Sequence, residues 1–220
     1  MIIVDRLAKW YPTRFGKKWV LRDLSLTIPY GCNVAILGRN GAGKSTLLRL
    51  VGGIERPSAG SVRIDGTMSW PLGLTGGHQG SMTGRDNVQF VARIHGCGPV
   101  ERARIVDFVC EFSELGRDFE LPVKSYSSGM RSRLAFAISI AFRFDWYLID
   151  ELRSVGDPAF KRKSAQAIAE LKGRSSFIMV THETRGLARE VDLVVVIHDG
   201  IATVYPDVQR GIAAYHAGAV

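Results

Sequence analysis

One segment near the start of the chain combines the residue types needed to hold a phosphate group. It reads Gly38-Arg39-Asn40-Gly41-Ala42-Gly43-Lys44-Ser45 and matches the pattern G-x-x-x-x-G-K-[ST] in full. Glycines let a backbone wrap closely around phosphate oxygens, and the N–H groups at a helix start attract the anion. We therefore predict a phosphate-binding loop, in which Lys44 contacts the β- and γ-phosphates and Ser45 gives a hydroxyl to Mg²⁺. A glycine-rich turn that matches by chance is the alternative.

Two adjacent carboxylates form a second candidate. Asp150 and Glu151 follow the apolar run at residues 146–149, which has the character of a buried strand. The carboxyl ends of such strands face the ligand crevice of a doubly wound sheet. Asp150 is suited to hold Mg²⁺, and Glu151 is suited to activate a water as general base. The alternative is a solvated turn, which the phosphate-binding loop upstream disfavours.

A serine-glycine turn provides a third candidate. Ser127, Ser128 and Gly129 precede a helix that is expected to begin near Arg131. A serine hydroxyl and the unpaired N–H groups of a helix start can bind a second anion. This pattern is weakly specific by itself, because many helices begin with such residues.

The elements that position these residues alternate between strands and helices. This order predicts an α/β fold with a mainly parallel sheet, and a mostly helical block at about residues 71–143 inserted between its strands. Residues 68–84 show no clear period. The expected strands are 2–4, 19–28, 34–37, 61–64, 146–149, 177–180, 193–197 and 201–204, and the expected helices are 45–51, 85–95, 100–115, 128–142, 158–171, 184–189 and 208–217.

Composition narrows the class of protein. The 220 residues are 46% hydrophobic and 23% charged, as in an ordinary globular domain. The net charge of +8 suggests an anionic neighbour (nucleotide, nucleic acid or an acidic membrane face) or a merely solvated basic surface. Three cysteines without a C-x-x-C pair argue against a disulfide framework or a zinc site. We expect no signal peptide and no membrane-spanning segment.

The order of these motifs resembles the ABC transporter ATPase family over nearly the whole chain. The resemblance implies a P-loop NTPase with a RecA-like parallel core, an N-terminal antiparallel β subdomain and an inserted helical subdomain. It implies one nucleotide-binding domain, with the core and β subdomain at residues 1–70 and 144–220. ATP and Mg²⁺ are the implied cofactors. The serine-glycine turn would cap the γ-phosphate of an ATP held by a second copy, so that two chains enclose two ATP molecules.

The same resemblance assigns roles to single residues. His182 stands at the position of the switch histidine, which contacts the γ-phosphate, and Asp157 stands in the loop that couples the two ATP sites. Thr46 continues the phosphate-binding segment. Tyr11 stands where the family stacks an aromatic ring on adenine, although a core or edge-strand aromatic is the alternative and Trp10 and Trp19 are nearby.

The chain departs from the family at its glutamine loop. The family's glutamine position falls near Gly73 and Leu74, where this chain has no glutamine. Gln79 is the candidate for the Mg²⁺ contact through a shifted loop. The alternatives are that this contact is missing, and that the glycine-rich run 76–80 is only slack beside a permease.

Two stretches resemble one branch of the family, the exporters of bacterial polysaccharides. The turn Tyr126-Ser127-Ser128-Gly129-Met130 is typical of exporters for capsule, O-antigen and teichoic acid, and residues 69–73 and 80–88 are similar to the capsule exporters. The chain ends soon after the ATPase core, so we expect no added C-terminal sugar-binding domain. O-antigen or teichoic acid remains the alternative cargo.

The resemblance also implies partners and a location. These are two copies of an integral membrane permease, a periplasm-spanning export component and a lipid-linked polysaccharide, at the cytoplasmic face of the bacterial inner membrane. A soluble ABC ATPase acting on nucleic acid or ribosomes is the alternative. It is disfavoured because the chain has one cassette and no aromatic-basic platform, so no nucleic-acid partner is expected. A P-loop kinase would not need the serine-glycine turn or His182.

Overall fold

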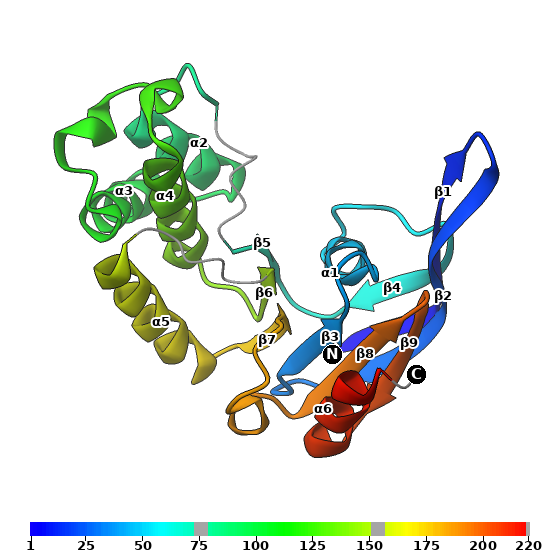
Figure 1. Cartoon of the computed structure of the whole chain (residues 1–220). Coiled ribbons are helices and arrows are strands. Elements are labelled where there is room, and N and C mark those ends of the chain that lie inside the picture. Colours follow the sequence, from blue (N-terminus) through cyan, green and yellow to red (C-terminus); the bar gives the residue numbers. More distant parts are fainter. Residues whose placement is uncertain (73–78, 151–156, 219–220) are drawn as a thin grey trace. The chain divides into compact units, whose positions relative to one another are not determined.

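The computed structural model describes residues 1–72, 79–150 and 157–218, and their contacts divide the chain into two compact units (Figure 1). Within the described residues, the first unit holds all strands together with the first and last α-helices, and the second unit is helical. In the described residues, no helix combines the length and the apolar character needed to cross a membrane.

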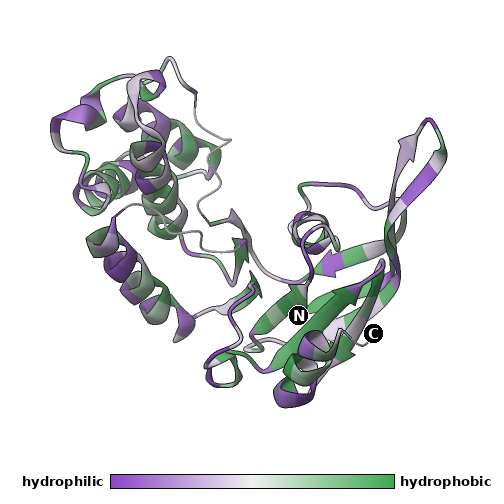
Figure 2. Cartoon of the chain, in the orientation of Figure 1, coloured by the Kyte–Doolittle hydropathy of each residue, from purple (hydrophilic) through white to green (hydrophobic). Residues whose placement is uncertain are grey.

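A six-stranded sheet forms the centre of the first unit. Its order is β5-β6-β7-β3-β8-β9, and all neighbours are parallel except the last pair, β8 and β9. The strands are β3 (Val34–Gly38), β5 (Met68–Pro71), β6 (Trp146–Asp150), β7 (Ser176–Val180), β8 (Leu193–His198) and β9 (Ile201–Tyr205). β3 and β7 are buried at every residue, as expected of parallel strands covered on both faces. Figure 2 shows this as continuous hydrophobic colouring along the inner strands.

A smaller antiparallel sheet with the order β2-β1-β4 completes the β structure. Its strands are β1 (Ile2–Thr13), β2 (Gly16–Ile28) and β4 (Ala59–Ile64). β1 and β2 form one long hairpin in which Trp10 pairs with Trp19 and Tyr11 with Lys18. This hairpin is longer than the ranges expected from sequence, because its outer part pairs two strands of mostly exposed residues that lack a clear apolar alternation.

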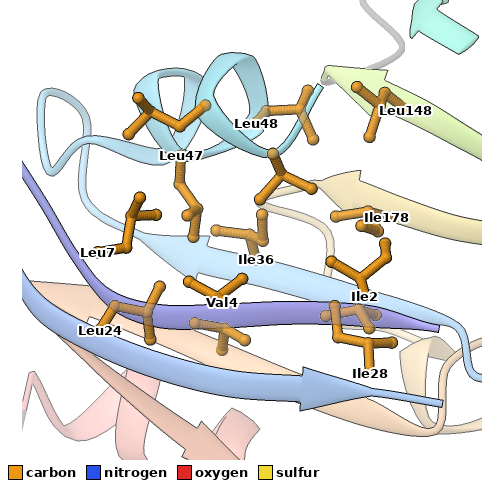
Figure 3. Close-up of a cluster of buried hydrophobic side chains, with 14 of the residues drawn as sticks. Ile2, Val4, Leu7, Leu24, Ile28, Ile36, Leu47, Leu48, Leu148 and Ile178 are labelled. Carbon is orange, nitrogen blue, oxygen red and sulfur yellow. The ribbon is translucent and has the colours of Figure 1, made fainter. Parts of the chain in front are cut away.

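The main core lies between the two sheets and helix α1 (Lys44–Val51), as Figure 3 shows. Ile2 and Val4 of β1 meet Ile36 of β3, and Leu47 and Leu48 of α1 pack on the same cluster. Each of these side chains is at most 2% exposed. Burial of such a side chain contributes about 1.5–3 kcal/mol, so the cluster fixes α1 on the end of β3.

The second unit consists of helices, of which α2 (Gly84–Ile94) starts at a side-chain cap and α3 (Pro99–Ser113) at a proline. Thr83 caps α2, and Pro99 opens α3. The 3₁₀ turns η2 (Gly116–Glu120) and η3 (Val123–Ser125) lead to α4 (Ser128–Ala141). Phe136 of α4 and Phe160 of α5 (Pro158–Lys172) lie edge to face, with ring centroids 6.2 Å apart. The contacts therefore group α5 with this unit, in addition to the helices of the inserted block.

Two local expectations from sequence differ from the structure. Strand β5 was not expected, because four residues ending in a proline carry no readable period. The helix expected at 184–189 is only the 3₁₀ turn η4 (Leu187–Arg189), because Gly186, with φ of 77°, precedes it outside the helical region. The expected terminal helix is confirmed as α6 (Val208–Ala217).

Candidate functional site

The glycine-rich segment forms a tight loop between β3 and α1. Gly41 and Gly43 have φ of 82° and 108°, a region that other residues rarely adopt. A Cβ at Gly43 would lie 2.8 Å from Cγ1 of Val20, so this position has no room for a side chain. The sequence folds this way because its glycines fall where the chain must turn back on itself.

Lys44 places a positive charge in this loop. Its ammonium donates to the carbonyl oxygens of Gly38, at 2.8 Å, and Arg39, at 3.0 Å, and the residue is only 7% exposed. Helix α1 begins at the same residue, with no side-chain cap and no acidic residue in its first turn. The ammonium and the uncapped helix start therefore give the loop the positive potential that a phosphate group requires.

Ser45 and Asp150 come together from distant parts of the chain. The Ser45 hydroxyl donates to Oδ1 of Asp150 across 3.2 Å, at the carboxyl end of β6. Neighbouring ligands of an octahedral Mg²⁺ lie about 3 Å apart, since each metal–oxygen bond is about 2.1 Å. The hydroxyl and the carboxylate therefore fit two adjacent positions around Mg²⁺, and phosphate oxygens and water suit the others. Glu151, the predicted general base, lies outside the described residues.

Thr46 is the next residue of α1 and is buried. Its hydroxyl accepts a hydrogen bond from the Arg49 guanidinium at 3.3 Å. The side chain is thus engaged within its own helix.

His182 lies beside the start of the phosphate-binding loop. It follows β7 and lines a cavity of about 380 Å³ together with Gly38 and Arg39. Its Nδ1 lies 3.3 Å from the hydroxyl of Tyr215 on α6. The structure therefore brings the predicted switch histidine to the loop that was predicted to hold the phosphates.

Tyr11 is held by a cluster of charged groups. Its hydroxyl donates to Oε1 of Glu55 at 2.6 Å, and the Lys9 ammonium lies 5.0 Å from its ring centroid. Burial alone raises the pKa of Glu55, but hydrogen bonds from Lys9, Tyr11 and Arg49 outweigh it and hold that pKa below its usual value. Lys18, the cross-strand partner of Tyr11, lines a cavity of about 580 Å³ with residues 39–42 of the loop. Stacking on adenine stays a prediction.

In the second unit, the serine-glycine turn forms the start of α4. The Ser127 hydroxyl caps the helix by accepting the N–H of Met130 at 3.2 Å, and no acidic residue occupies the first turn. The Arg131 guanidinium donates to the carbonyl oxygen of Tyr126 and so holds the residue that precedes the turn. Burial raises the pKa of Tyr126 to about 12, and its hydroxyl donates to the carbonyl oxygen of Asp118 at 2.7 Å. Ser127, Ser128 and Gly129 thus have the backbone geometry of an anion site.

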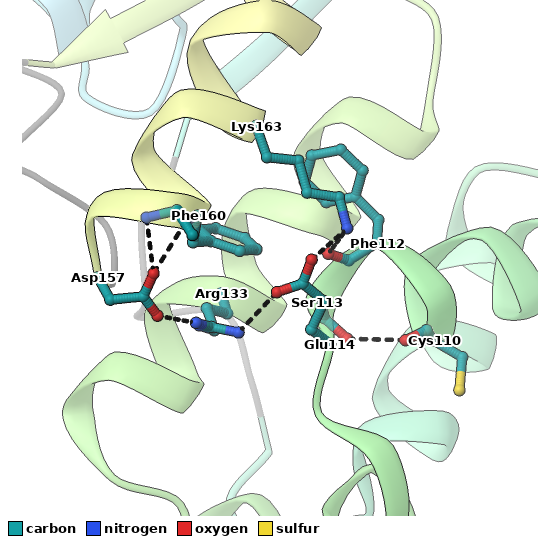
Figure 4. Close-up of polar contacts among 9 residues, drawn as sticks. Cys110, Phe112, Ser113, Glu114, Arg133, Asp157, Phe160 and Lys163 are labelled. Carbon is teal, nitrogen blue, oxygen red and sulfur yellow. Dashed lines mark hydrogen bonds and ion pairs between the residues drawn. The ribbon is translucent and has the colours of Figure 1, made fainter.

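The Asp157 carboxylate has two structural roles, which Figure 4 shows: it caps α5 and binds Arg133. One carboxylate oxygen caps α5 by accepting the N–H groups of Ala159, at 2.8 Å, and Phe160, at 3.1 Å. The other oxygen accepts from the Arg133 guanidinium, which also donates to Glu114 at 3.2 Å. Sequence reasoning missed Arg133 and Glu114, because no spacing along the chain connects the three residues.

Gln79 lies in the loop before α2. Its N–H donates to Oδ1 of Asn87 at 2.8 Å, and its carbonyl oxygen accepts from Nδ2 of Asn87 at 3.1 Å. The exposed side chain belongs to the second unit, whereas Ser45 and Asp150 belong to the first. Its role at Mg²⁺ stays a prediction.

Comparison with known proteins gives consistent results. A model of the ABC transporter family matches residues 21–154. The polysialic acid transport ATP-binding protein KpsT of Escherichia coli is 50% identical over 216 residues, which cover 98% of this chain and 96% of that protein. The capsule polysaccharide export ATP-binding protein CtrD of Neisseria meningitidis serogroup B (strain ATCC BAA-335 / MC58) is 42% identical, with 99% of each chain covered.

Solved structures support the fold. The dimeric structure of a post-hydrolysis state of the ATP-binding cassette MJ0796 bound to ADP and Pi superposes with a TM-score of 0.79. It is 21% identical and covers 93% of this chain and 98% of its own. The described elements thus have the arrangement of an ATP-binding cassette, as the sequence predicted.

Proposed function

The chain belongs to the ABC transporter family, and we propose that it is the ATP-hydrolysing subunit of an exporter of capsular polysaccharide. Two relatives that are similar over almost their whole length, KpsT and CtrD, carry names of polysialic acid transport and capsule polysaccharide export. Relatives named for O-antigen export are more distant, for example one from Klebsiella pneumoniae at 37% identity. Capsule is therefore the cargo that these similarities favour.

The observation that carries the ATP-hydrolysing part of this proposal is the contact between Ser45 and Asp150. It joins the phosphate-binding loop to the end of β6 with the oxygen atoms that Mg²⁺ prefers. Ser45 and Asp150 would hold Mg²⁺ there, and the ion would supply positive charge to the phosphates. Lys44 and the start of α1 hold the phosphates, so the reacting group stays in one place.

Three further residues are assigned to hydrolysis and recognition. Glu151, directly after the Mg²⁺ ligand Asp150, takes a proton from the attacking water as general base. His182 donates to a γ-phosphate oxygen from the cavity beside Gly38. Tyr11 stacks on the adenine, a contact that its place across from Lys18 supports.

Two copies of the chain enclose two ATP molecules in this proposal. The start of α4, with Ser127, Ser128 and Gly129, caps the γ-phosphate held by the other copy. Two features support this role. The Ser127 hydroxyl lies at the start of α4, and no acidic residue in the first turn offsets the positive potential of the helix start. In this arrangement, Asp157 couples the two ATP sites, and Gln79 contacts the Mg²⁺.

The proposed assembly includes two copies of a membrane permease, a periplasm-spanning export component and a lipid-linked polysaccharide. The chain would lie at the cytoplasmic face of the inner membrane, held there by the permease. Its net charge of +8 suits an anionic lipid surface nearby.

Replacement of one carboxylate tests the proposal. Glu151→Gln should bind ATP, lose turnover by at least about 10²-fold, and trap a dimer bound to a polytopic permease co-expressed from its own locus. Glu170→Gln removes an exposed carboxylate from α5 and serves as the matched control. Persistent turnover in Glu151→Gln would contradict the assigned base. If the chain binds nucleic acid and no permease, the assignment as a transporter subunit is wrong, and a soluble ABC ATPase is favoured instead.

A further inference from the structure

Helix α6 lies unusually close to strand β8. Asp207 caps the helix, and Gly211 is buried one turn further on. A Cβ at Gly211 would lie 2.8 Å from Cβ of Val194, a fully buried residue of β8. Only a glycine permits this approach, so the distance and rotation of α6 on the sheet are fixed.

This docking directs Tyr215 toward His182. Tyr215 follows Gly211 by four residues, and residues at this spacing share one face of a helix. Its hydroxyl lies 3.3 Å from Nδ1 of His182. The next residue, His216, places Nε2 at 3.1 Å from the Thr184 hydroxyl. Two consecutive residues of α6 therefore hold two alternate residues of the segment that follows β7.

The identity of the His182 atom decides what this contact can do. A neutral imidazole carries one proton, and the hydrogen bond made by one nitrogen determines whether the other is protonated. A tyrosine hydroxyl that donates to Nδ1 selects the tautomer with the proton on Nε2. The two nitrogens point to opposite sides of the ring, so Nε2–H is directed away from the Tyr215 hydroxyl.

We propose that Tyr215 is a positioning residue for ATP hydrolysis, which donates to Nδ1 of His182 and so keeps Nε2 protonated toward the γ-phosphate. The proposal rests on the function assigned to His182 above. The shared cavity supports it, because Gly38, Arg39, His182 and Tyr215 all line the same space beside the phosphate-binding loop. Without the hydroxyl, His182 loses a contact that favours the proton on Nε2, the position from which it would donate to a phosphate oxygen.

The test is Tyr215→Phe in the full chain, assembled with its permease for kinetics. It should lower kcat about 10- to 100-fold, the scale for loss of a group that orients a functional imidazole, and leave the KM for ATP nearly unchanged. In the full chain labelled with ¹⁵N-histidine, wild-type His182 should show a protonated Nε2 and an unprotonated Nδ1. Tyr215→Phe should shift both resonances toward a mixture of tautomers.

Two control variants separate positioning from packing. Tyr205→Phe removes a hydroxyl on β9 that makes no hydrogen bond within the described part of the chain, and it should change neither kcat nor the resonances. Thr184→Ala removes the second contact of α6 and should leave the His182 tautomer as in the wild type.

The possible failures are distinguishable. If His182→Ala keeps full turnover, the function assigned to His182 is wrong and the role of Tyr215 fails with it. If His182→Ala is inactive but Tyr215→Phe has wild-type kcat, only the role of Tyr215 is wrong. A wild-type His182 protonated on Nδ1 would overturn the proposal even if Tyr215→Phe did not fold.

Discussion

Arg133 of α4 pairs with Asp157, the residue that caps α5, and the same guanidinium reaches Glu114 just after α3. Its charged carbon also lies 4.7 Å from the ring centroid of Phe160, so the side chain packs on the aromatic cluster while it binds both carboxylates. One residue of α4 thus joins the end of α3 to the start of α5.

The Asp157 carboxylate should make stability depend on acid pH. The N–H of Phe160 is the largest cause that holds the pKa of Asp157 below its ordinary value of 3.8; desolvation opposes it, and the N–H of Ala159 and the Arg133 guanidinium lower the pKa further. A group with a lowered pKa in the folded state contributes fully above its unfolded pKa. Its contribution should disappear as the pH falls from 3.8 through the lower folded value. Urea unfolding midpoints from pH 7 to pH 3 measure this.

Two substitutions separate the cap from the ion pair. Asp157→Asn keeps a capping oxygen and loses the charge, whereas Asp157→Ala loses both. At pH 7, Asp157→Ala should unfold at lower urea than Asp157→Asn, and both at lower urea than the wild type. The difference between Asp157→Asn and the wild type should shrink as the pH falls below 3.8. A difference that does not change with pH would contradict the charge-dependent part.

Phe160 should be a sensitive position of the aromatic cluster. It is fully buried and meets Phe112 and Phe136 edge to face. Phe160→Ala should lower the free energy of unfolding by about 3–5 kcal/mol, because it removes apolar contacts and leaves a cavity. Phe15→Ala, at an 88% exposed residue, should change it by less than about 0.5 kcal/mol. Equal effects in chemical denaturation would show that the cluster is not a core.

The two loop glycines should respond differently to a methyl group. Gly41 and Gly43 both have positive φ, but only at Gly43 would a Cβ meet another atom within 4 Å. Gly41→Ala should cost about 1–2 kcal/mol of stability from backbone strain alone. Gly43→Ala should cost more, because the clash with Val20 adds to the strain. Thermal unfolding of the nucleotide-free protein gives the comparison, and a larger loss for Gly41→Ala would contradict it.

Removal of either proposed Mg²⁺ ligand should uncouple nucleotide binding from hydrolysis. Ser45→Ala and Asp150→Asn should still bind ATP in EDTA, since the loop and Lys44 remain. Both should lose the gain in affinity that Mg²⁺ gives, and turnover should fall by about 10²-fold or more. Titrations with and without Mg²⁺ measure the change, with Ser58→Ala, outside the loop, as the control. Wild-type Mg²⁺ dependence in both variants would rule out this pair as ligands.

The sequence alone predicted the parts of the molecule whose signals are local. The loop from Gly38 to Ser45 was found because its glycines, lysine and serine must be adjacent to surround a phosphate. The inner strands were found because burial on both faces demands unbroken apolar runs. Membership in the ABC transporter family followed from the order of these motifs and is confirmed.

Other features could not be predicted because they depend on contacts between distant residues. Arg133 lies on α4, Glu114 follows α3 and Asp157 precedes α5, and no period relates the three residues. The contact between Tyr215 and His182 forms only because Gly211 lets α6 pack on β8, and the sequence does not show this packing. The outer half of the β1–β2 hairpin was also missed, since backbone pairing holds it together without a buried apolar face.

The short strand β5 has a consequence for self-association. It forms one edge of the six-stranded sheet, with only four residues, and it ends in Pro71, which has no N–H to offer. The Ser69 hydroxyl even takes the place of a backbone acceptor for the N–H of Leu148. An incoming strand would find almost no template at this edge. Crowded copies of the protein are thus protected at this edge from joining their sheets into aggregates.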